Sequence, residues 1–259
     1  MIEKRYALIT GASSGLGAEF AQQLAALGHP LILVARREEK LTALASTLRE
    51  QYGVAVEVIA ADLSQPETPQ KIAALCSASG WQVDWLINNA GVAGPDLLKD
   101  RDWSDQYAFY QLMMLSVAEM CHLFIPSMVE RGQGRVINIA SAHGLTASQF
   151  KSAYIAAKHG VVGMTKSVAL ETAEEPITAN AICPGYVLTP LVEEQIPDTM
   201  REYDMSREDV IKNVMLKRQP SKEFATVEQL GGTAVFLASE AAAQITGTTI
   251  SVDGGWTAL

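Results

Sequence analysis

The sequence has few of the residues on which several classes of protein depend. Only 3 of its 259 residues are cysteine and 4 are histidine, and neither type recurs at the spacing of metal ligands. The cysteines at positions 76, 121 and 183 lie far apart, which suits a reducing compartment better than a disulfide framework. We therefore expect a cytoplasmic protein without a catalytic metal.

Positive charge is also scarce. Lysine and arginine number 20 against 29 aspartate and glutamate residues, so the formal net charge is -9. Nucleic acids and anionic membranes are bound by a clustered excess of basic residues, so we expect neither as a partner. No apolar run approaches the length of a membrane span, and the opening residues MIEKRYALIT lack the apolar core of an export signal.

What the chain does contain is apolar runs that alternate with helical patterns. Its 48% hydrophobic content is typical of a globular α/β protein, and we expect one domain over residues 1–259. Strands are predicted at residues 6–10, 31–35, 54–60, 83–87, 135–140, 177–183 and 248–252. This alternation predicts a doubly wound parallel sheet whose site lies at the carboxyl ends of the strands. The polar segment at about 191–220 breaks the rhythm and is predicted to form a helical lid.

A glycine-rich loop follows the first predicted strand. Gly11 allows a tight turn, Gly15 leaves room for a phosphate, and Gly17 lets the next helix pack closely on the strand. Backbone amides at the start of that helix then face an anion. The same loop would suit an ordinary turn, but its place between a strand and a helix favours a bound nucleotide.

The end of the second predicted strand indicates which nucleotide. Ala35 and Arg36 stand where NAD-binding proteins usually carry a carboxylate, and an arginine suits the 2′-phosphate of NADP. We therefore expect NADP(H), with NAD(H) as the alternative, whereas Arg37 could equally belong to a solvated helix start. Asp62, after the third strand, could accept a hydrogen bond from an adenine amino group or cap the following helix.

Tyr154 and Lys158 are four residues apart in a predicted helix and so share one face. A nearby ammonium favours the phenolate and lowers the pKa of a tyrosine from its ordinary value of about 10. Such a phenol could exchange a proton with an alcohol or ketone oxygen, and Ser141 could donate a second hydrogen bond to that oxygen. This spacing also arises by chance in many helices.

Taken together and in this order, the motifs resemble the short-chain dehydrogenase/reductase family across essentially the whole chain. They are TGxxxGxG from Thr10, Asn88-Asn89-Ala90-Gly91, Ser141, Tyr154-x-x-x-Lys158 and Pro184-Gly185. The resemblance implies a Rossmann fold with seven parallel strands, hydride transfer at a nicotinamide, and a homotetramer paired through the helices near 103–131 and 152–172. It makes Tyr154 the general acid/base, Lys158 a ligand of the nicotinamide ribose that lowers the tyrosine pKa, and Ser141 the residue that orients the substrate oxygen.

The resemblance also extends the predicted cofactor site. Its members are Gly11, Ser13, Ser14, Gly15, Leu16, Gly17, Arg36, Asp62, Leu63, Asn89, Ala90, Gly91, Tyr154, Lys158, Pro184, Gly185, Val187 and Thr189.

From about residue 139 onward the chain resembles bacterial D-3-hydroxybutyrate dehydrogenases. In those enzymes the residues matching His143, Lys151 and Gln195 hold the substrate carboxylate and neighbouring groups. Tyr186 and Trp256 complete the predicted substrate site. Without the resemblance, His143 and Lys151 would be interpreted as solvated surface residues.

The first half of the chain looks more like NADP-dependent reductases of broad substrate range, and it departs from the family pattern. Met113 stands where the family usually has an asparagine that supports a proton-relay water, and nearby Ser116 could substitute for it. Ala93 replaces a glutamine that hydroxybutyrate dehydrogenases carry, and Tyr186 replaces a tryptophan.

Three functions are therefore open. The leading prediction is a reversible dehydrogenase of a short 3-hydroxy acid, converting (R)-3-hydroxybutyrate and acetoacetate, on the strength of His143, Lys151 and Gln195. The alternative is an NADPH-dependent reductase of neutral ketones or acyl carbonyls, on the strength of Arg36, Met113 and Ala93. A nucleotide-binding scaffold without catalysis is the third, and the presence of the serine, tyrosine and lysine argues against it.

Overall fold

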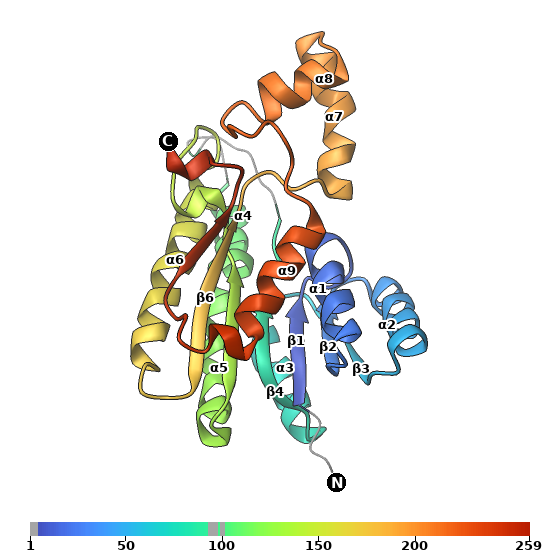
Figure 1. The fold of residues 1–259 in the computed structure, drawn as a ribbon, viewed down its shortest axis with the longest axis vertical. Helices are drawn as coiled ribbons and strands as arrows, with labels where there is room; N and C mark the ends of the chain where they lie inside the picture. Colours follow the sequence, from blue (N-terminus) through green and yellow to red (C-terminus); the bar gives the residue numbers. More distant parts are fainter. Residues whose placement is uncertain (1–4, 93–97, 99–101) are drawn as a thin grey trace.

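In the computed structural model, which describes residues 5–92, 98 and 102–259, seven strands form one parallel sheet (Figure 1). They are β1 (Arg5–Thr10), β2 (Leu31–Ala35), β3 (Val56–Ala60), β4 (Gln82–Asn88), β5 (Gly134–Ile139), β6 (Ile177–Pro184) and β7 (Thr249–Val252). Their order in space is β3-β2-β1-β4-β5-β6-β7, so the strand order reverses between β1 and β4. Open parallel sheets bind ligands beside such a reversal. The predicted Rossmann fold is confirmed.

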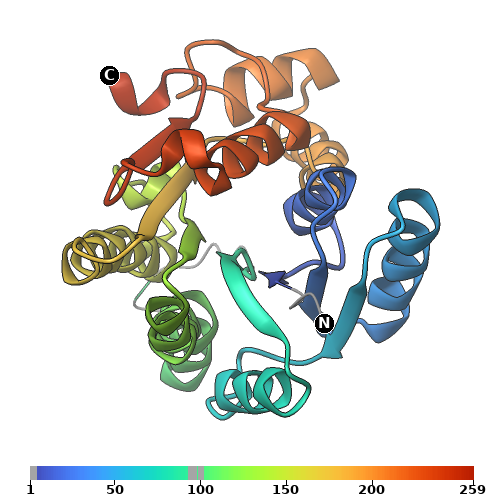
Figure 2. The ribbon, with the colours of Figure 1, turned by 60° about the horizontal axis from the view of Figure 1, so that its bottom comes forward.

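Helices cover both faces of the sheet (Figure 2). One face carries α1 (Gly15–Ala26), α2 (Glu38–Tyr52) and α9 (Val227–Ala238), and the other carries α3 (Thr68–Ala78), α5 (Ser116–Arg131) and α6 (Ser152–Glu171). Because strand side chains alternate between faces, Ile9 packs in the core under α1, α2 and α9, while Leu8 packs in the core under α3, α5 and α6. Burial on both faces explains why the strands are continuous apolar runs.

Helix α1 begins at Gly15, four residues before the predicted start at Glu19. Ser14 has an extended backbone, with φ -173° and ψ 170°, so the glycine loop leads directly into the first helical turn. The unpaired amides of that turn therefore belong to the loop itself. This places the anion-binding end of α1 at the carboxyl end of β1.

One long helix combines α4 (Trp103–Tyr110), the π-helical turn η1 (Gln111–Leu115) and α5. It spans 29 residues with a mean hydropathy of 1.6, which by length and composition alone is enough to cross a membrane. The expectation that no apolar run approaches the length of a membrane span is therefore corrected for this helix. Its side chains Met120, Phe124 and Met128 are buried in the core under the sheet. The apolar composition of α5 is accordingly that of a core helix.

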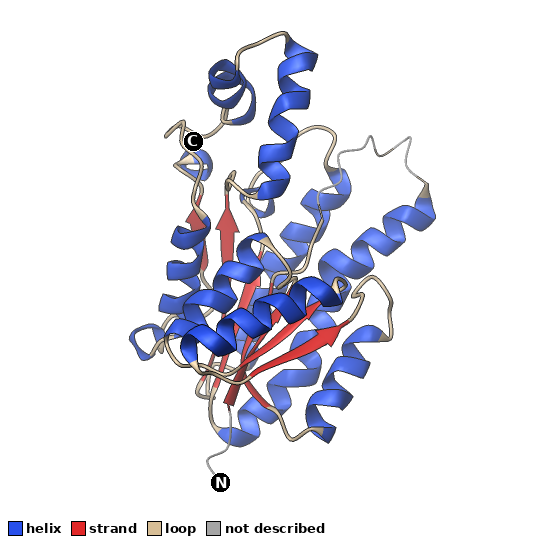
Figure 3. Ribbon diagram, turned by 90° about the vertical axis from the view of Figure 1, so that its right-hand side faces the viewer, coloured by secondary structure: helices blue, strands red, loops and turns tan. Residues whose placement is uncertain are grey.

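The predicted lid segment lies beyond the carboxyl ends of the strands, at the top of Figures 1 and 3. It contains α7 (Pro190–Tyr203), α8 (Arg207–Asp209) and the π-helical η3 (Val210–Met215). Ile196, Val210 and Met215 form a small apolar cluster of their own there. The remaining short helices are η2 (Ala142–Gly144), η4 (Glu240–Ala242) and η5 (Trp256–Ala258).

The close packing of α1 on β1 yields a first prediction. A methyl group at Gly17 would lie 2.4 Å from the Gly11 carbonyl oxygen and 2.7 Å from Asn89 Nδ2, so Gly17→Ala should lower the free energy of unfolding by about 1–3 kcal/mol. Gly232→Ala is the matched control, since a methyl group there meets nothing within 4 Å and should stabilise α9 by about 0.5–1 kcal/mol. Urea unfolding measures both. Equal stability of the two variants would contradict this account of α1 packing.

Candidate active site

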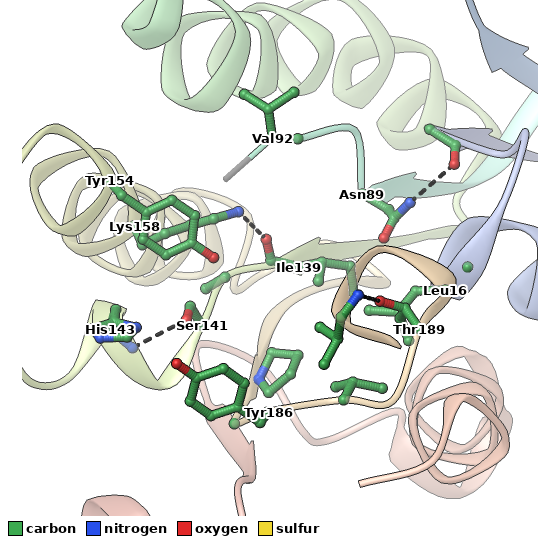
Figure 4. Close-up of a pocket in the computed structure, with 18 of the residues that line it drawn as sticks. Leu16, Asn89, Val92, Ile139, Ser141, His143, Tyr154, Lys158, Tyr186 and Thr189 are labelled. Atoms are coloured by element: carbon green, nitrogen blue, oxygen red, sulfur yellow. Dashed lines mark hydrogen bonds between the residues drawn. The ribbon is translucent and has the colours of Figure 1, made fainter. Parts of the chain in front are cut away.

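A cavity of about 700 Å³ lies at the carboxyl ends of β1, β4, β5 and β6, against the start of α7 (Figure 4). Most of the predicted site residues line it: Gly11, Ser14, Gly15, Leu16, Asn89, Gly91, Ser141, His143, Lys151, Tyr154, Lys158, Pro184, Gly185, Tyr186, Val187, Thr189, Gln195 and Trp256. The lining also includes Val92, Met113, Ile139, Ala140, Pro190 and Val192. These side chains are apolar and take no part in recognisable chemistry. Only their position near the end of a strand could have indicated in the sequence that they line the cavity.

The glycine loop forms one wall of the cavity and is tied to the end of β4. Asn89 and Ala90 donate their backbone N–H groups to Thr10 Oγ1, at 2.9 and 3.0 Å, and Asn89 Nδ2 donates to the Thr10 carbonyl oxygen at 3.0 Å. Gly15 has φ +55°, and a methyl group there would project to 3.7 Å from Thr189 Cγ2. Because Gly15 has no side chain, its backbone faces the cavity directly. An exposed backbone at a helix start is suited to binding the diphosphate of a dinucleotide.

Ser141, Tyr154 and Lys158 meet in this cavity although they come from different elements. Ser141 follows β5 and accepts a hydrogen bond from the backbone N–H of His143 at 3.1 Å. Lys158, one turn after Tyr154 on α6, donates from Nζ to the Ile139 carbonyl oxygen at 2.7 Å. Its ammonium nitrogen lies 5.8 Å from the centre of the Tyr154 ring (Figure 4).

The pKa of Tyr154 is raised, which is the opposite of the direction predicted from its lysine neighbour. Burial is the main cause, and the hydrogen bond with Ser141 opposes it only in part. The ammonium of Lys158 is directed at a carbonyl oxygen, and burial lowers the pKa of this lysine to about 8. At neutral pH the phenol of Tyr154 is therefore protonated and Lys158 is mostly charged.

His143 lies at the other end of the cavity. Its ring is edge-on to Trp256, with centroids 5.0 Å apart, and to Tyr154, with centroids 6.0 Å apart, and its Nε2 is 3.0 Å from Ser148 Oγ. Burial lowers the pKa of His143 to about 4, helped by the charge of Lys151. This histidine is therefore neutral at pH 7 and can donate one ring N–H.

Lys151 provides the positive charge at the end of the cavity where His143 lies. Its Nζ lies 5.9 Å from the centre of the Tyr186 ring, and that ring stacks on Trp256 with an interplanar angle of 12°. No carboxylate pairs with Lys151 among the residues that the structure describes. Gln195 is exposed on α7 and also faces the cavity. A half-buried ammonium without a counter-ion is suited to an anionic ligand.

Six predicted cofactor residues do not line this cavity: Ser13, Gly17, Arg36, Asp62, Leu63 and Ala90. Leu63 is buried in the core, and Asp62 accepts a hydrogen bond from the Ser64 N–H at 3.0 Å, as in a turn. Arg36 is exposed, whereas Arg37 Nη2 donates to Ser13 Oγ at 2.9 Å and to Ser14 Oγ at 2.8 Å. It is thus Arg37 that lies on the glycine loop.

Met113 is buried and lines the cavity from η1. Its sulfur accepts a hydrogen bond from the backbone N–H of Val92 at 3.3 Å. Ser116 does not take over the role of the missing asparagine, because its hydroxyl donates to the Leu112 carbonyl oxygen at 2.8 Å and is not part of the lining. The substitution at Ala93 lies outside the described residues.

Known proteins resemble this chain in both sequence and fold. The model of the short chain dehydrogenase family matches residues 5–199. D-beta-hydroxybutyrate dehydrogenase of Rhizobium meliloti (strain 1021) is 45% identical, over 97% of this chain and 98% of that protein. The same-named protein of Cupriavidus necator is 39% identical over 100% of both chains. L-sorbose reductase from Gluconobacter frateurii, solved in complex with NADPH and L-sorbose, has a TM-score of 0.93 at 29% identity, over 100% of this chain and 98% of that one.

The buried ammonium yields a prediction on stability. The pKa of Lys158 is about 8 in the folded protein against an ordinary value of 10.5, so the folded state binds fewer protons between these pH values. The contribution of Lys158 to the free energy of unfolding should therefore rise with pH from about 8 to 10.5, while the three cysteines, whose pKa burial raises from 9.0, act in the opposite direction above that value. Lys158→Met should lose this contribution, so the difference in free energy of unfolding between wild type and the variant should change in favour of wild type by about 1–3 kcal/mol from pH 8 to 10.5, and the variant should be inactive.

Urea unfolding at a series of pH values measures this effect. Lys166→Met is the control, because Lys166 is exposed on the same helix and should change stability by no more than about 0.5 kcal/mol at any pH. A difference in stability between wild type and Lys158→Met that stays constant from pH 8 to 10.5 would refute the account.

Proposed function

Because this chain belongs to the short-chain dehydrogenase family and is a nicotinamide-dependent oxidoreductase, we propose that its substrate is a short 3-hydroxy acid. The pair we propose is (R)-3-hydroxybutyrate and acetoacetate, with NADP(H) as the cofactor. One observation carries the proposal: the ammonium of Lys151, which has no counter-ion among the described residues, lies in the same cavity as Ser141 and Tyr154. A carboxylate held by Lys151 would direct the neighbouring carbon of a small substrate toward those hydroxyl groups.

The chain's own residues fit the cofactor. The bare backbone at Gly15 and the start of α1 would hold the diphosphate, and Lys158 would hold the nicotinamide ribose. Arg37, which bonds to Ser13 and Ser14 on the glycine loop, together with exposed Arg36, supports a 2′-phosphate and so NADP(H). When bound, the cofactor supplies or accepts the hydride.

Tyr154 is the proton donor in the direction of reduction. Its raised pKa keeps the phenol protonated at neutral pH, so the proton that a ketone oxygen needs is in place. Ser141, which is hydrogen-bonded to Tyr154, can donate to the same oxygen and orient it. In the direction of oxidation the phenol must first lose its proton, so alcohol oxidation should accelerate as the pH rises and ketone reduction should not.

The substrate end combines one charge with apolar walls. Lys151 provides the charge, and neutral His143 provides a hydrogen bond without a second charge. Tyr186 and Trp256, which stack with centroids 5.9 Å apart, border this end. Gln195 on α7 supplies an amide from the lid side. This set supports a small anionic substrate over a bulky one.

The second candidate is NADPH-dependent reduction of neutral ketones or acyl carbonyls. The apolar lining by Val92, Met113 and Val192 favours it, because those side chains would accept a longer uncharged substrate. This lining also includes no amide at position 113, so nothing there assists the transfer of a proton to solvent.

The proposal also covers the oligomeric state, the domain organisation and the lid. We propose a cytoplasmic homotetramer in which α4, α5 and α6 pair subunits, since Trp103 is 70% exposed, Tyr107 is 58% exposed and Leu170 is 79% exposed on these helices. We also propose that residues 1–259 act as one domain and that 191–220 close over the cavity as a lid. The position of Gln195 supports this proposal, because this residue of α7 already lines the cavity.

The substrate is tested by comparing 3-hydroxybutyrate with a neutral alcohol of like size, using each cofactor. Wild type should prefer the acid, and Lys151→Met should raise its KM by about 10-fold to 100-fold while leaving the neutral alcohol unaffected. Tyr154→Phe should abolish turnover of both with cofactor binding intact, which a scaffold without catalysis could not show. A wild-type enzyme that turns over the acid no faster than the neutral alcohol would refute the proposed substrate.

The cofactor is tested at the two arginines. Arg37→Ala should raise the KM for NADPH by about 10-fold or more and leave the KM for NADH almost unchanged, because only NADPH carries the 2′-phosphate. Arg36→Ala, which removes an exposed neighbour, should have the smaller effect. Strong preference of wild type for NADH, unaltered in both variants, would refute the assignment.

A further inference from the structure

Arg218 is an exposed cation that lies outside the cavity lining but contacts the loop leading to Lys151. It follows η3 and stands between two buried residues, Leu216 and Gln219, with relative exposures of 0% and 1%. Gln219 Oε1 accepts a hydrogen bond from the backbone N–H of Tyr186 at 3.1 Å. The backbone that carries Arg218 is therefore fixed to one of the aromatic walls of the cavity.

The guanidinium reaches the loop that carries the substrate cation. Arg218 Nη1 donates to the Ala147 carbonyl oxygen at 2.6 Å. The next residue, Ser148, bonds through Oγ to His143 Nε2 at 3.0 Å, and Lys151 follows three residues later. Arg218 thus joins the end of the lid segment to the loop between η2 and α6, at residues that were not predicted to be part of the site.

That loop contains a strained residue. Phe150 has φ +62°, in the left-handed region that a bulky side chain rarely occupies, and it directly precedes Lys151. Since Phe150 is 53% exposed, its own packing does little to hold this conformation. Among the described residues, the hydrogen bonds of Arg218 to Ala147 and between Ser148 and His143 help to fix the loop.

The cations Lys151 and Arg218 are near enough to influence each other, in a protein whose net charge is -9. The charge of Arg218 lowers the pKa of Lys151 after burial, and it also lowers the pKa of His143. Within the described part of the chain neither Lys151 nor Arg218 is paired with a carboxylate. Like charges that interact repel each other, and an anion bound at Lys151 offsets that repulsion.

We propose that Arg218, although it does not line the cavity, is a specificity-determining residue that adds a second positive charge near Lys151 and is held there by its bond to the Ala147 carbonyl. The inference rests on the proposed hydroxy-acid substrate. It adds that discrimination between an acid and a neutral substrate comes from two cations on separate segments, Lys151 on the loop and Arg218 at the end of the lid segment.

Three variants test the role of this charge. Arg218→Gln keeps a hydrogen-bond donor but loses the charge, Arg218→Lys keeps the charge, and Lys217→Gln removes a charge from the exposed neighbouring position. The measured quantity is the ratio of kcat/KM for acetoacetate to that for a neutral ketone of like size, at low and high salt. Cofactor binding and thermal unfolding establish that each variant is folded.

Arg218→Gln should reduce this ratio by about 10-fold through a higher KM for the acid, with the neutral ketone unaffected. Arg218→Lys and Lys217→Gln should stay close to wild type. The inference is overturned if Arg218→Gln keeps the wild-type ratio, if it slows both ketones equally, or if Lys217→Gln reduces the ratio as much. A wild type without preference for the acid refutes instead the proposed substrate, so the two failures are distinct.

Discussion

The ammonium of Lys158 donates to the carbonyl oxygen of Ile139 at 2.7 Å, and this bond joins α6 to the end of β5. Because Tyr154 lies one turn before Lys158 and Ser141 lies two residues after Ile139, the same bond brings the phenol and the serine hydroxyl together. The contact is made where Lys158 is only 6% exposed, so the charge has almost no water around it. The lowered pKa of this lysine reflects the free-energy cost of burying its charge.

Burial governs the protonation of the whole cavity. It raises the pKa of Tyr154 and lowers those of His143 and Lys158, so each of these groups is shifted toward its neutral form. A protonated phenol is ready to give a proton, and a neutral histidine adds no charge of its own. The positive charge that lines the substrate end is that of Lys151, and Arg218, which we propose as a second cation, comes from a segment that only the fold brings near it.

The sequence predicted the sheet well because parallel strands are buried on both faces and so read as continuous apolar runs. It also predicted that Ser141, Tyr154 and Lys158 would meet, since strand ends and helix periodicity fix their places. It favoured Arg36 over Arg37, whereas Arg37 is the one bonded to the glycine loop, because adjacent residues give no indication of which side chain turns back onto that loop. The direction of the Tyr154 pKa was wrong, because it depends on burial and on where the ammonium points.

Local patterns in the chain thus determined the fold, the edge of the sheet that carries the site, and the family, since these follow from residue types at short spacings. Only the tertiary structure decided which of the two arginines lies on the loop, how the three central groups ionise, and that Arg218 stands beside the loop of Lys151. The reason is physical: desolvation and charge interactions depend on distances between segments far apart in the chain, and no local pattern encodes those distances.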